Sequence, residues 1–130
     1  MTFSEKIDIA VDIKDSGDYN CSQFVAAVLA DETDYSEEEL ANVAAGFGGG
    51  MGNLEATCGA LIGVVLVAGF KTKGNGTVEV ARRIQEEFAK RCGAIRCSDL
   101  QKITDGKPLC SCKECARNAL KIYGEVMGLS

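Results

Sequence analysis

Histidine is absent from this chain, and proline occurs only once. Without histidine the protein can have no Cys–His nucleophile pair, no histidine base and no zinc finger of the two-cysteine, two-histidine type. A single proline gives little indication of a linker, so we expect residues 1–130 to form one domain. Long apolar runs are missing as well. The longest, residues 58–70, has thirteen residues and three glycines, whereas a membrane-spanning helix needs about 20 apolar residues.

The N-terminal segment, MTFSEKIDIAVD, lacks the basic start and the apolar core of a signal peptide. We therefore expect a soluble, cytoplasmic protein with no membrane partner. The net charge of −5 argues against nucleic acid as its main partner.

Charge is distributed unevenly along the chain. Residues 1–70 hold two basic and twelve acidic side chains, whereas residues 71–130 hold twelve basic and seven acidic ones. Two explanations are open. The halves can attract each other as solvated faces within a monomer or dimer. Alternatively, the basic half can neutralise an anionic group, such as thiolates or a negatively charged cluster.

The seven cysteines are the strongest feature of the composition. In a reducing compartment, a set of cysteines is more often metal-binding or catalytic than disulfide-bonded, and an odd number also disfavours a purely structural disulfide set. The sequence CKEC at residues 112–115 is followed by Ala116, so it is not the CxxCH haem-attachment motif.

Helical periodicity runs through most of the chain and predicts an all-α fold. We expect a compact bundle of five or more helices, with little or no sheet, around a central apolar helix that follows a glycine-rich loop at residues 46–52. A break is expected at residues 16–18, and a capping box at residues 36–39. The expected helices span residues 4–15, 19–30, 36–45, 53–69, 77–92 and 111–127.

The central helix carries small residues, Gly59 and Gly63 with Ala56 and Ala60, near one face. Such a stripe allows close packing of helices within the bundle, or alternatively the seam of a homodimer. No Lys–Ser pair follows the glycine-rich loop, so we do not expect a Walker phosphate site.

Two cysteines are expected near the N-terminal ends of helices. Cys21 falls in the first turn of its helix, where the helix dipole and free amides stabilise a thiolate. Cys58 is expected one turn into the central helix, after glycines that let backbone amides approach a sulfur or an anion. Each cysteine taken alone also fits the description of a small core residue, but seven together favour a chemical role.

Cys110, Cys112 and Cys115 form a CxCxxC motif at the start of the last helix. Cysteines at i and i+3 of a helix face the same side, and the third lies in the preceding turn. This arrangement suits a metal ion or cluster with Cys92 or Cys97 as fourth ligand. It suits equally a dithiol that closes to a disulfide.

Several segments together resemble the redox-active protein family named C-GCAxxG-C-C. They are YNCSQ at residues 19–23, GFGGGMG at 46–52, TCGALIG at 57–63, and Cys97 and Cys115 further along the chain. The resemblance extends over residues 7–126. It implies an all-helical, redox-active protein with four family cysteines, here Cys21, Cys58, Cys97 and Cys115.

The chain departs from the family pattern in one place and adds to it in another. The family motif reads Gly-Cys-Ala, whereas here Gly59 lies between Cys58 and Ala60. Three cysteines are additional to the pattern and form a second candidate group of metal ligands: Cys92, Cys110 and Cys112. A related domain occurs in haem-carrying split-Soret cytochromes, but this chain has neither a haem motif nor a histidine, so we expect no haem.

These observations predict a protein that binds an iron–sulfur cluster through the four family cysteines and serves electron transfer or redox sensing with a partner redox protein. Two other functions are compatible with the same residues. One is a thiol–disulfide oxidoreductase in which Cys58 attacks and another cysteine resolves. The other is a binding protein with a structural zinc site made of four cysteines.

Overall fold

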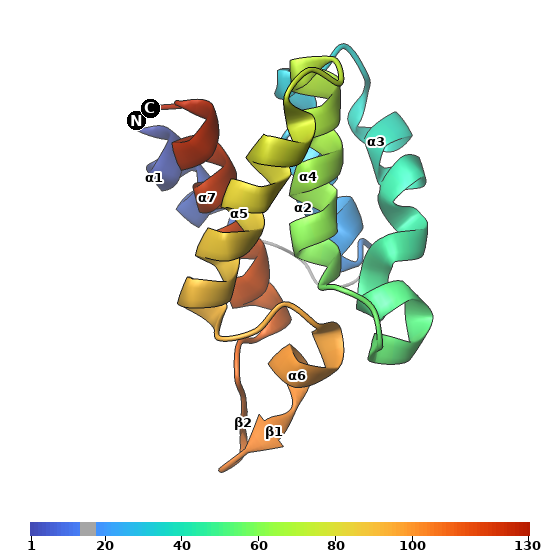
Figure 1. Cartoon of the computed structure of the whole chain (residues 1–130), viewed down its shortest axis with the longest axis vertical. Helices are drawn as coiled ribbons and strands as arrows, with labels where there is room; N and C mark the ends of the chain where they lie inside the picture. Colours follow the sequence, from blue (N-terminus) through green and yellow to red (C-terminus); the bar gives the residue numbers. More distant parts are fainter. Residues whose placement is uncertain (14–17) are drawn as a thin grey trace.

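The structure is a computed structural model that describes residues 1–13 and 18–130, and helices dominate it (Figure 1). The described residues form seven α-helices: α1 (Phe3–Asp12), α2 (Cys21–Val28), α3 (Glu37–Ala44), α4 (Gly59–Thr72), α5 (Thr77–Cys92), α6 (Cys97–Gln101) and α7 (Cys112–Met127). Strands β1 (Ile103–Thr104) and β2 (Lys107–Pro108) form a small antiparallel hairpin. The predicted all-α bundle is confirmed. The break expected at residues 16–18 falls mostly outside the described residues.

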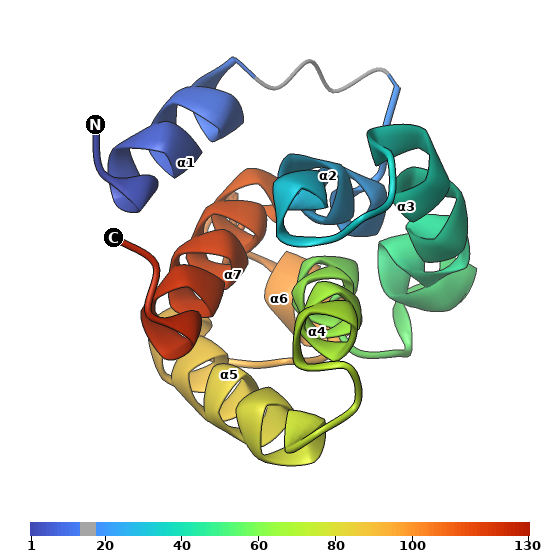
Figure 2. The same cartoon turned by 90° about the horizontal axis from the view of Figure 1, so that it is seen from above.

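Helix α4 is the centre of the bundle. It packs against α2, α5 and α7, as the view from above shows (Figure 2). Its side chains Leu61, Val64 and Val67 are all buried, which fits a helix that is apolar nearly all round. In the described part of the chain, no helix is both long and apolar enough to cross a membrane.

Local capping signals set several helix starts. The side chain of Ser36 accepts a hydrogen bond from the amide of Glu39 at 3.1 Å, and the Glu39 carboxylate accepts one from the amide of Ser36 at 3.0 Å. This confirms the predicted capping box at the start of α3. Asn20 and Gln23 make the same reciprocal arrangement at α2, and the Ser111 side chain caps α7. These caps determine that α2 begins at Cys21 and α7 at Cys112.

The central helix begins later than residue 53, where the sequence pattern placed its start. Residues 49–52 all have left-handed backbone angles, with φ of 61° at Gly49 and 60° at Met51. These residues turn a corner in the chain, and Leu54, with φ of 68°, extends the irregular backbone beyond residue 53. Residues 56–58 then pair with residues 95–97, with Thr57 opposite Arg96, so that α4 starts only at Gly59. Gly50 lies at that corner against Cys97, where a Cβ atom would approach the Cys97 Cβ to 2.8 Å. Cys58 is thus the N-cap of α4 rather than a residue one turn inside it.

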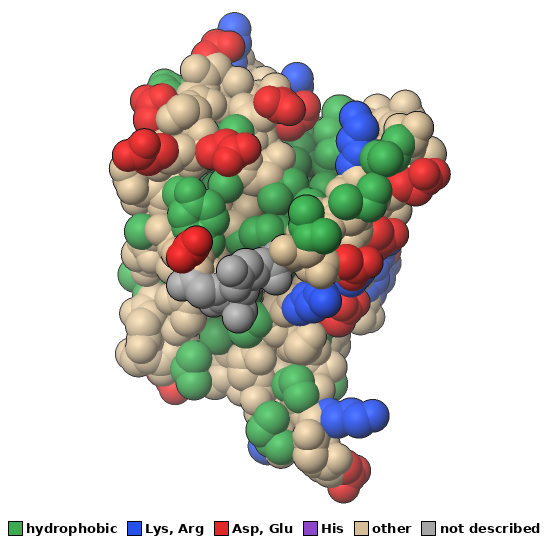
Figure 3. Space-filling model, turned by 180° about the vertical axis from the view of Figure 1, so that it is seen from behind, with side chains coloured by type: hydrophobic (Ala, Val, Ile, Leu, Met, Phe, Trp, Pro, Cys, Tyr) green, Lys and Arg blue, Asp and Glu red, His purple; other side chains and the backbone are tan. Residues whose placement is uncertain are grey.

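The hairpin projects from the lower end of the molecule, beyond α6 (Figure 1). Seen from behind, it forms a narrow tip that carries apolar and charged side chains (Figure 3). Its two strands pair Ile103 with Pro108 and Thr104 with Lys107. The hairpin therefore returns the chain from α6 to Cys110, next to the start of α7.

Ser22 on α2 gives a testable packing prediction. It is fully buried, and its Oγ has no hydrogen-bond partner among the described residues. A buried hydroxyl without a partner costs free energy that a methyl group does not. We expect Ser22→Ala to raise the free energy of unfolding by about 1 kcal/mol, measured by urea denaturation. A loss of stability in this variant would show that the hydroxyl is satisfied in the folded protein.

Candidate thiolate site

Three buried cysteines meet at the lower end of the bundle. Cys92 is the last residue of α5, Cys110 precedes α7, and Cys115 lies in the first turns of α7. Their sulfur atoms all lie within 4.8 Å of one another. Within the described residues, this is the one group of three or more potential metal ligands at such spacing. Figure 1 shows the reason, because the C-terminal end of α5 and the N-terminal end of α7 come together above α6.

Cys58 adjoins this group from the start of α4. Its sulfur hydrogen-bonds with the thiol of Cys115, and this contact is the largest cause of a lowered pKa at Cys58. The backbone amides of Leu61 and Ala60 lower the pKa further, because they lie in the first turn of α4 and have no partner inside the helix. Four thiols from three segments, the start of α4, the end of α5 and the start of α7, are therefore connected through Cys115.

Backbone hydrogen bonds from the α6 region hold two of these cysteines. The amide of Cys58 donates to the carbonyl of Ile95 at 2.7 Å, and the amide of Cys110 donates to the carbonyl of Leu100 at 3.0 Å. The Gln101 side-chain amide donates to the carbonyl of Cys110, also at 3.0 Å. Sequence patterns did not indicate Gln101, because a single glutamine at the end of a short helix carries no recognisable signal. The segment around α6 thus positions Cys58 and Cys110 relative to each other.

Contacts among the three cysteines give their thiols very different pKa values. Contacts with Cys115 and then with Cys92 lower the pKa of Cys110 to about 3. The contact with Cys110 is in turn the main cause of a raised pKa at Cys115, and it helps to raise the pKa of Cys92 to about 12. The Cys115 thiol donates its hydrogen to the backbone carbonyl of Cys110 at 3.4 Å, while the lowered pKa makes Cys110 the group that ionises most readily of the three.

This difference in pKa predicts a particular pH titration. At about pH 5 an ordinary thiol, with a pKa of about 8.5, is fully protonated. Cys110 should stay ionised there, because its folded-state pKa is lowered to about 3, while Cys92 stays protonated. We expect the metal-free protein to keep thiolate ultraviolet absorbance at that pH, and Cys110→Ser to lose the part that Cys110 contributes. Complete loss of thiolate absorbance in the unmutated protein below neutral pH would contradict the assignment.

Besides Cys58, three cysteines lie outside the group of three. Cys97, the first residue of α6, is buried, and burial followed by the negative charges of Cys58 and Cys112 raises its pKa. Cys21 is half-buried, and its sulfur lies 3.7 Å from the carbonyl oxygen of Cys112. Cys112 itself is exposed.

The structure thus brings the predicted site residues together only in part. Of the four family cysteines, Cys58 and Cys115 are in contact, while Cys21 and Cys97 lie apart from the group of three. Of the CxCxxC motif, Cys110 and Cys115 converge with Cys92, which was one of the two predicted fourth ligands. Cys112 does not join them, because the first residue of α7 faces solvent.

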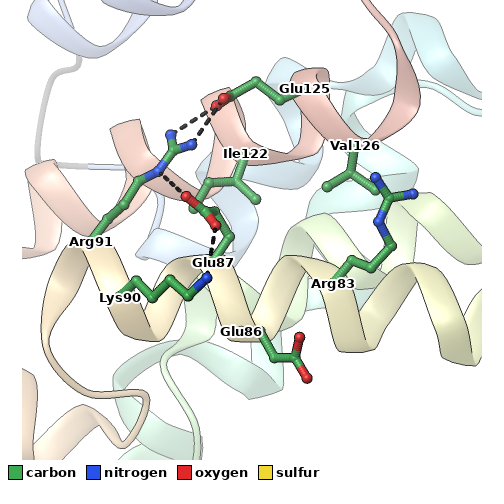
Figure 4. Close-up of a pocket in the computed structure, with 8 residues that line it drawn as sticks. All are labelled: Arg83, Glu86, Glu87, Lys90, Arg91, Ile122, Glu125 and Val126. Carbon is green, nitrogen blue, oxygen red and sulfur yellow. Dashed lines mark hydrogen bonds and ion pairs between the residues drawn. The ribbon is translucent and has the colours of Figure 1, made fainter.

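A separate groove lies between α5 and α7, and Figure 4 shows its lining. Its volume is about 390 Å³, and no cysteine contributes to it. Its charged side chains largely pair with one another: Arg91 contacts Glu125 and Glu87, both within 3.0 Å. The charges in this groove therefore largely neutralise one another, and the cysteine thiols lie in another part of the molecule.

The fold and the site together define a class of protein: a helical bundle that buries a connected group of cysteine thiols. The chain belongs to the family described as "Putative redox-active protein (C_GCAxxG_C_C)", whose sequence model matches residues 19–126. This confirms the family resemblance seen in the sequence. No curated protein matches the chain, and no solved structure does.

Proposed function

We propose that this protein transfers electrons or senses redox state through iron held by the buried thiolates of Cys58, Cys92, Cys110 and Cys115. The observation that carries the proposal is the convergence of three buried sulfurs within 4.8 Å of one another, with Cys58 in contact with Cys115. Membership of a redox-active family supports a redox role for them.

The spacing of the sulfurs suits a metal. In a tetrahedral thiolate site with metal–sulfur bonds of about 2.3 Å, neighbouring sulfurs lie about 3.8 Å apart. Sulfurs already within 4.8 Å of one another need only a small inward movement to reach that spacing. Thiolate is also the ligand that soft and borderline metals such as iron and zinc prefer.

The surrounding chain residues suit a buried negative charge. The N-terminal ends of α4 and α7 both lie at the site, and the free amides of Ala60 and Leu61 on α4 stabilise the Cys58 thiolate. Leu100, whose carbonyl accepts the hydrogen bond from the Cys110 amide, is fully buried, and the cysteines belong to the same apolar core. Iron would supply a one-electron couple in this environment, whereas zinc has no redox chemistry. The redox character of the family therefore favours iron.

The compact spacing also bears on the form of the iron. In an iron–sulfur cluster the ligands are shared among several irons, so their sulfurs spread further apart than around one ion. The three closely spaced sulfurs support a single iron ion. The cluster predicted from the sequence, with Cys21, Cys58, Cys97 and Cys115 as ligands, remains a prediction.

A second candidate function is thiol–disulfide exchange within the same site. It is favoured by the lowered pKa of Cys110 beside the protonated thiols of Cys92 and Cys115. A thiolate next to a second thiol is the arrangement that forms and opens disulfides.

The experiment is to purify the protein without oxygen and to measure iron, zinc and acid-labile sulfide per chain together with the absorption spectrum. Iron without sulfide, with a spectrum that bleaches on reduction, would support the proposal. Iron with matching sulfide would replace it by the cluster. Zinc, or a colourless protein without metal whose thiols oxidise reversibly, would overturn it in favour of a structural site or a dithiol.

A further inference from the structure

We propose that Cys21 and Cys112 form a second redox site, a surface dithiol that closes to a disulfide by exchange with the disulfide of a low-molecular-mass thiol. Neither residue belongs to the group of three buried cysteines. The inference goes beyond the proposed iron site and does not depend on it.

The topology brings these two cysteines together from distant parts of the chain. Cys21 is the first residue of α2 and Cys112 is the first residue of α7, and the two helices pack against each other. The Cys21 sulfur lies 3.7 Å from the carbonyl oxygen of Cys112, although 91 positions separate the residues. The sulfur of Cys21 thus already touches the main chain of Cys112. Disulfide formation requires the exposed Cys112 side chain to rotate about its Cα–Cβ bond until its sulfur reaches that of Cys21.

Exposure sets the order in which the two sulfurs react. Cys112 is exposed and Cys21 is half-buried, whereas Cys92, Cys110 and Cys115 are at most 8% exposed. An external disulfide therefore meets Cys112 first and Cys21 second. This is the order of an attacking and a resolving cysteine.

The reaction has two exchange steps. The Cys112 thiolate attacks one sulfur of the external disulfide, so that a mixed disulfide forms on Cys112 and one small thiol leaves. The Cys21 thiolate then attacks the Cys112 sulfur, which forms the Cys21–Cys112 disulfide and releases the second small thiol. Two protein thiols are oxidised, one external disulfide is reduced, and the two protons go to the released thiols.

A positive charge next to Cys112 favours a small anionic disulfide as the oxidant. Lys113 follows directly, and its side chain is half exposed, with Asp12 as a neighbour at 4.0 Å. A surface ion pair of that length binds weakly, so the ammonium group can also attract a carboxylate of an incoming molecule. Oxidised glutathione carries such carboxylates and is the probe for the test.

The test treats the reduced full chain with oxidised glutathione, blocks remaining thiols by alkylation, and maps disulfides in a non-reducing digest by mass spectrometry. We expect a Cys21–Cys112 cross-linked peptide as the main product, with fragmentation spectra that distinguish Cys112 from Cys110. Cys21→Ser should instead accumulate one stable glutathione adduct, on Cys112. Cys112→Ser should reduce both the cross-link and the adduct to background.

Cys97→Ser is the matched control, since Cys97 is likewise the first residue of its helix. It should leave the yield of the cross-link unchanged. A main disulfide between Cys112 and any other cysteine, or an unmodified Cys112 in the Cys21→Ser variant, would overturn the proposal. Metal content measured in the same variants distinguishes a failure of this proposal from a failure of the proposed iron site. A protein that binds no iron can still form this disulfide, and a protein that binds iron can fail to form it.

Discussion

Cys115→Ser is expected to remove most of the iron bound by protein purified without oxygen. The Cys115 sulfur contacts Cys58, Cys92 and Cys110, so its loss removes one ligand and also separates Cys58 from the other two. Changing even an indirect partner of a metal ligand costs about 10–100-fold in affinity, and loss of a thiolate ligand should cost at least that much. The free energy of unfolding of the metal-free protein should fall by only about 1–2 kcal/mol, because serine is nearly isosteric with cysteine. Iron per chain and urea denaturation measure the two effects.

The comparison of Cys92→Ser with Cys97→Ser decides between two ligand sets. Both cysteines are buried, so the same substitution perturbs the core to a similar extent. The compact group includes Cys92, whereas the family pattern includes Cys97. We expect Cys92→Ser to lose iron as Cys115→Ser does, and Cys97→Ser to keep it. The opposite result would restore the ligand set predicted from the sequence.

A second large effect is expected from Gly63→Ala in the centre of the bundle. A Cβ atom at Gly63 would lie 2.8 Å from the backbone carbonyl oxygen of Ser22 and would also meet the Val25 side chain. Backbone cannot move aside as a flexible side chain can, so α2 and α4 would have to separate. Overpacking of this kind costs about 1–3 kcal/mol, and we expect the free energy of unfolding to fall by about that amount.

Gly69→Ala provides the control on the same helix. A Cβ atom there would have no neighbour closer than 4.0 Å. Alanine has the higher helix propensity, so this variant should gain about 0.5–1 kcal/mol. Opposite signs for the two variants in urea denaturation would establish the close α2–α4 contact. A loss of similar size in both would mean that α4 tolerates no added methyl group for reasons other than this contact.

Much of the fold could be predicted from local sequence signals. Helix α5 runs over the predicted residues 77–92, because its apolar positions recur at helical spacing between two glycines that break it. The capping box at residues 36–39 is likewise a local feature. The start of α4 could not be predicted in this way. It depends on the pairing of residues 56–58 with residues 95–97, a contact between distant segments that no local pattern shows.

Less of the candidate site than of the fold could be predicted from the sequence. Cys92 and Cys110 approach each other because α6 and the hairpin fold back between them. A five-residue helix and two-residue strands are too short to show a period of any kind. The opposite orientations of Cys112 and Cys115 depend on which face of α7 meets α4 and α5. Composition therefore indicated thiolate chemistry, while the pairing of particular sulfurs needed the tertiary structure.

The order of the ligands along the chain has a consequence for biosynthesis. Cys58 and Cys92 leave the ribosome well before Cys110 and Cys115, and the last two become useful only when α7 packs against α4 and α5. A nascent chain therefore presents soft metal ligands in an incomplete set, next to an apolar α4 that still lacks its partner helix. The proposed iron site is therefore complete only after α7 has been synthesised and packed, and we expect iron to bind after that step.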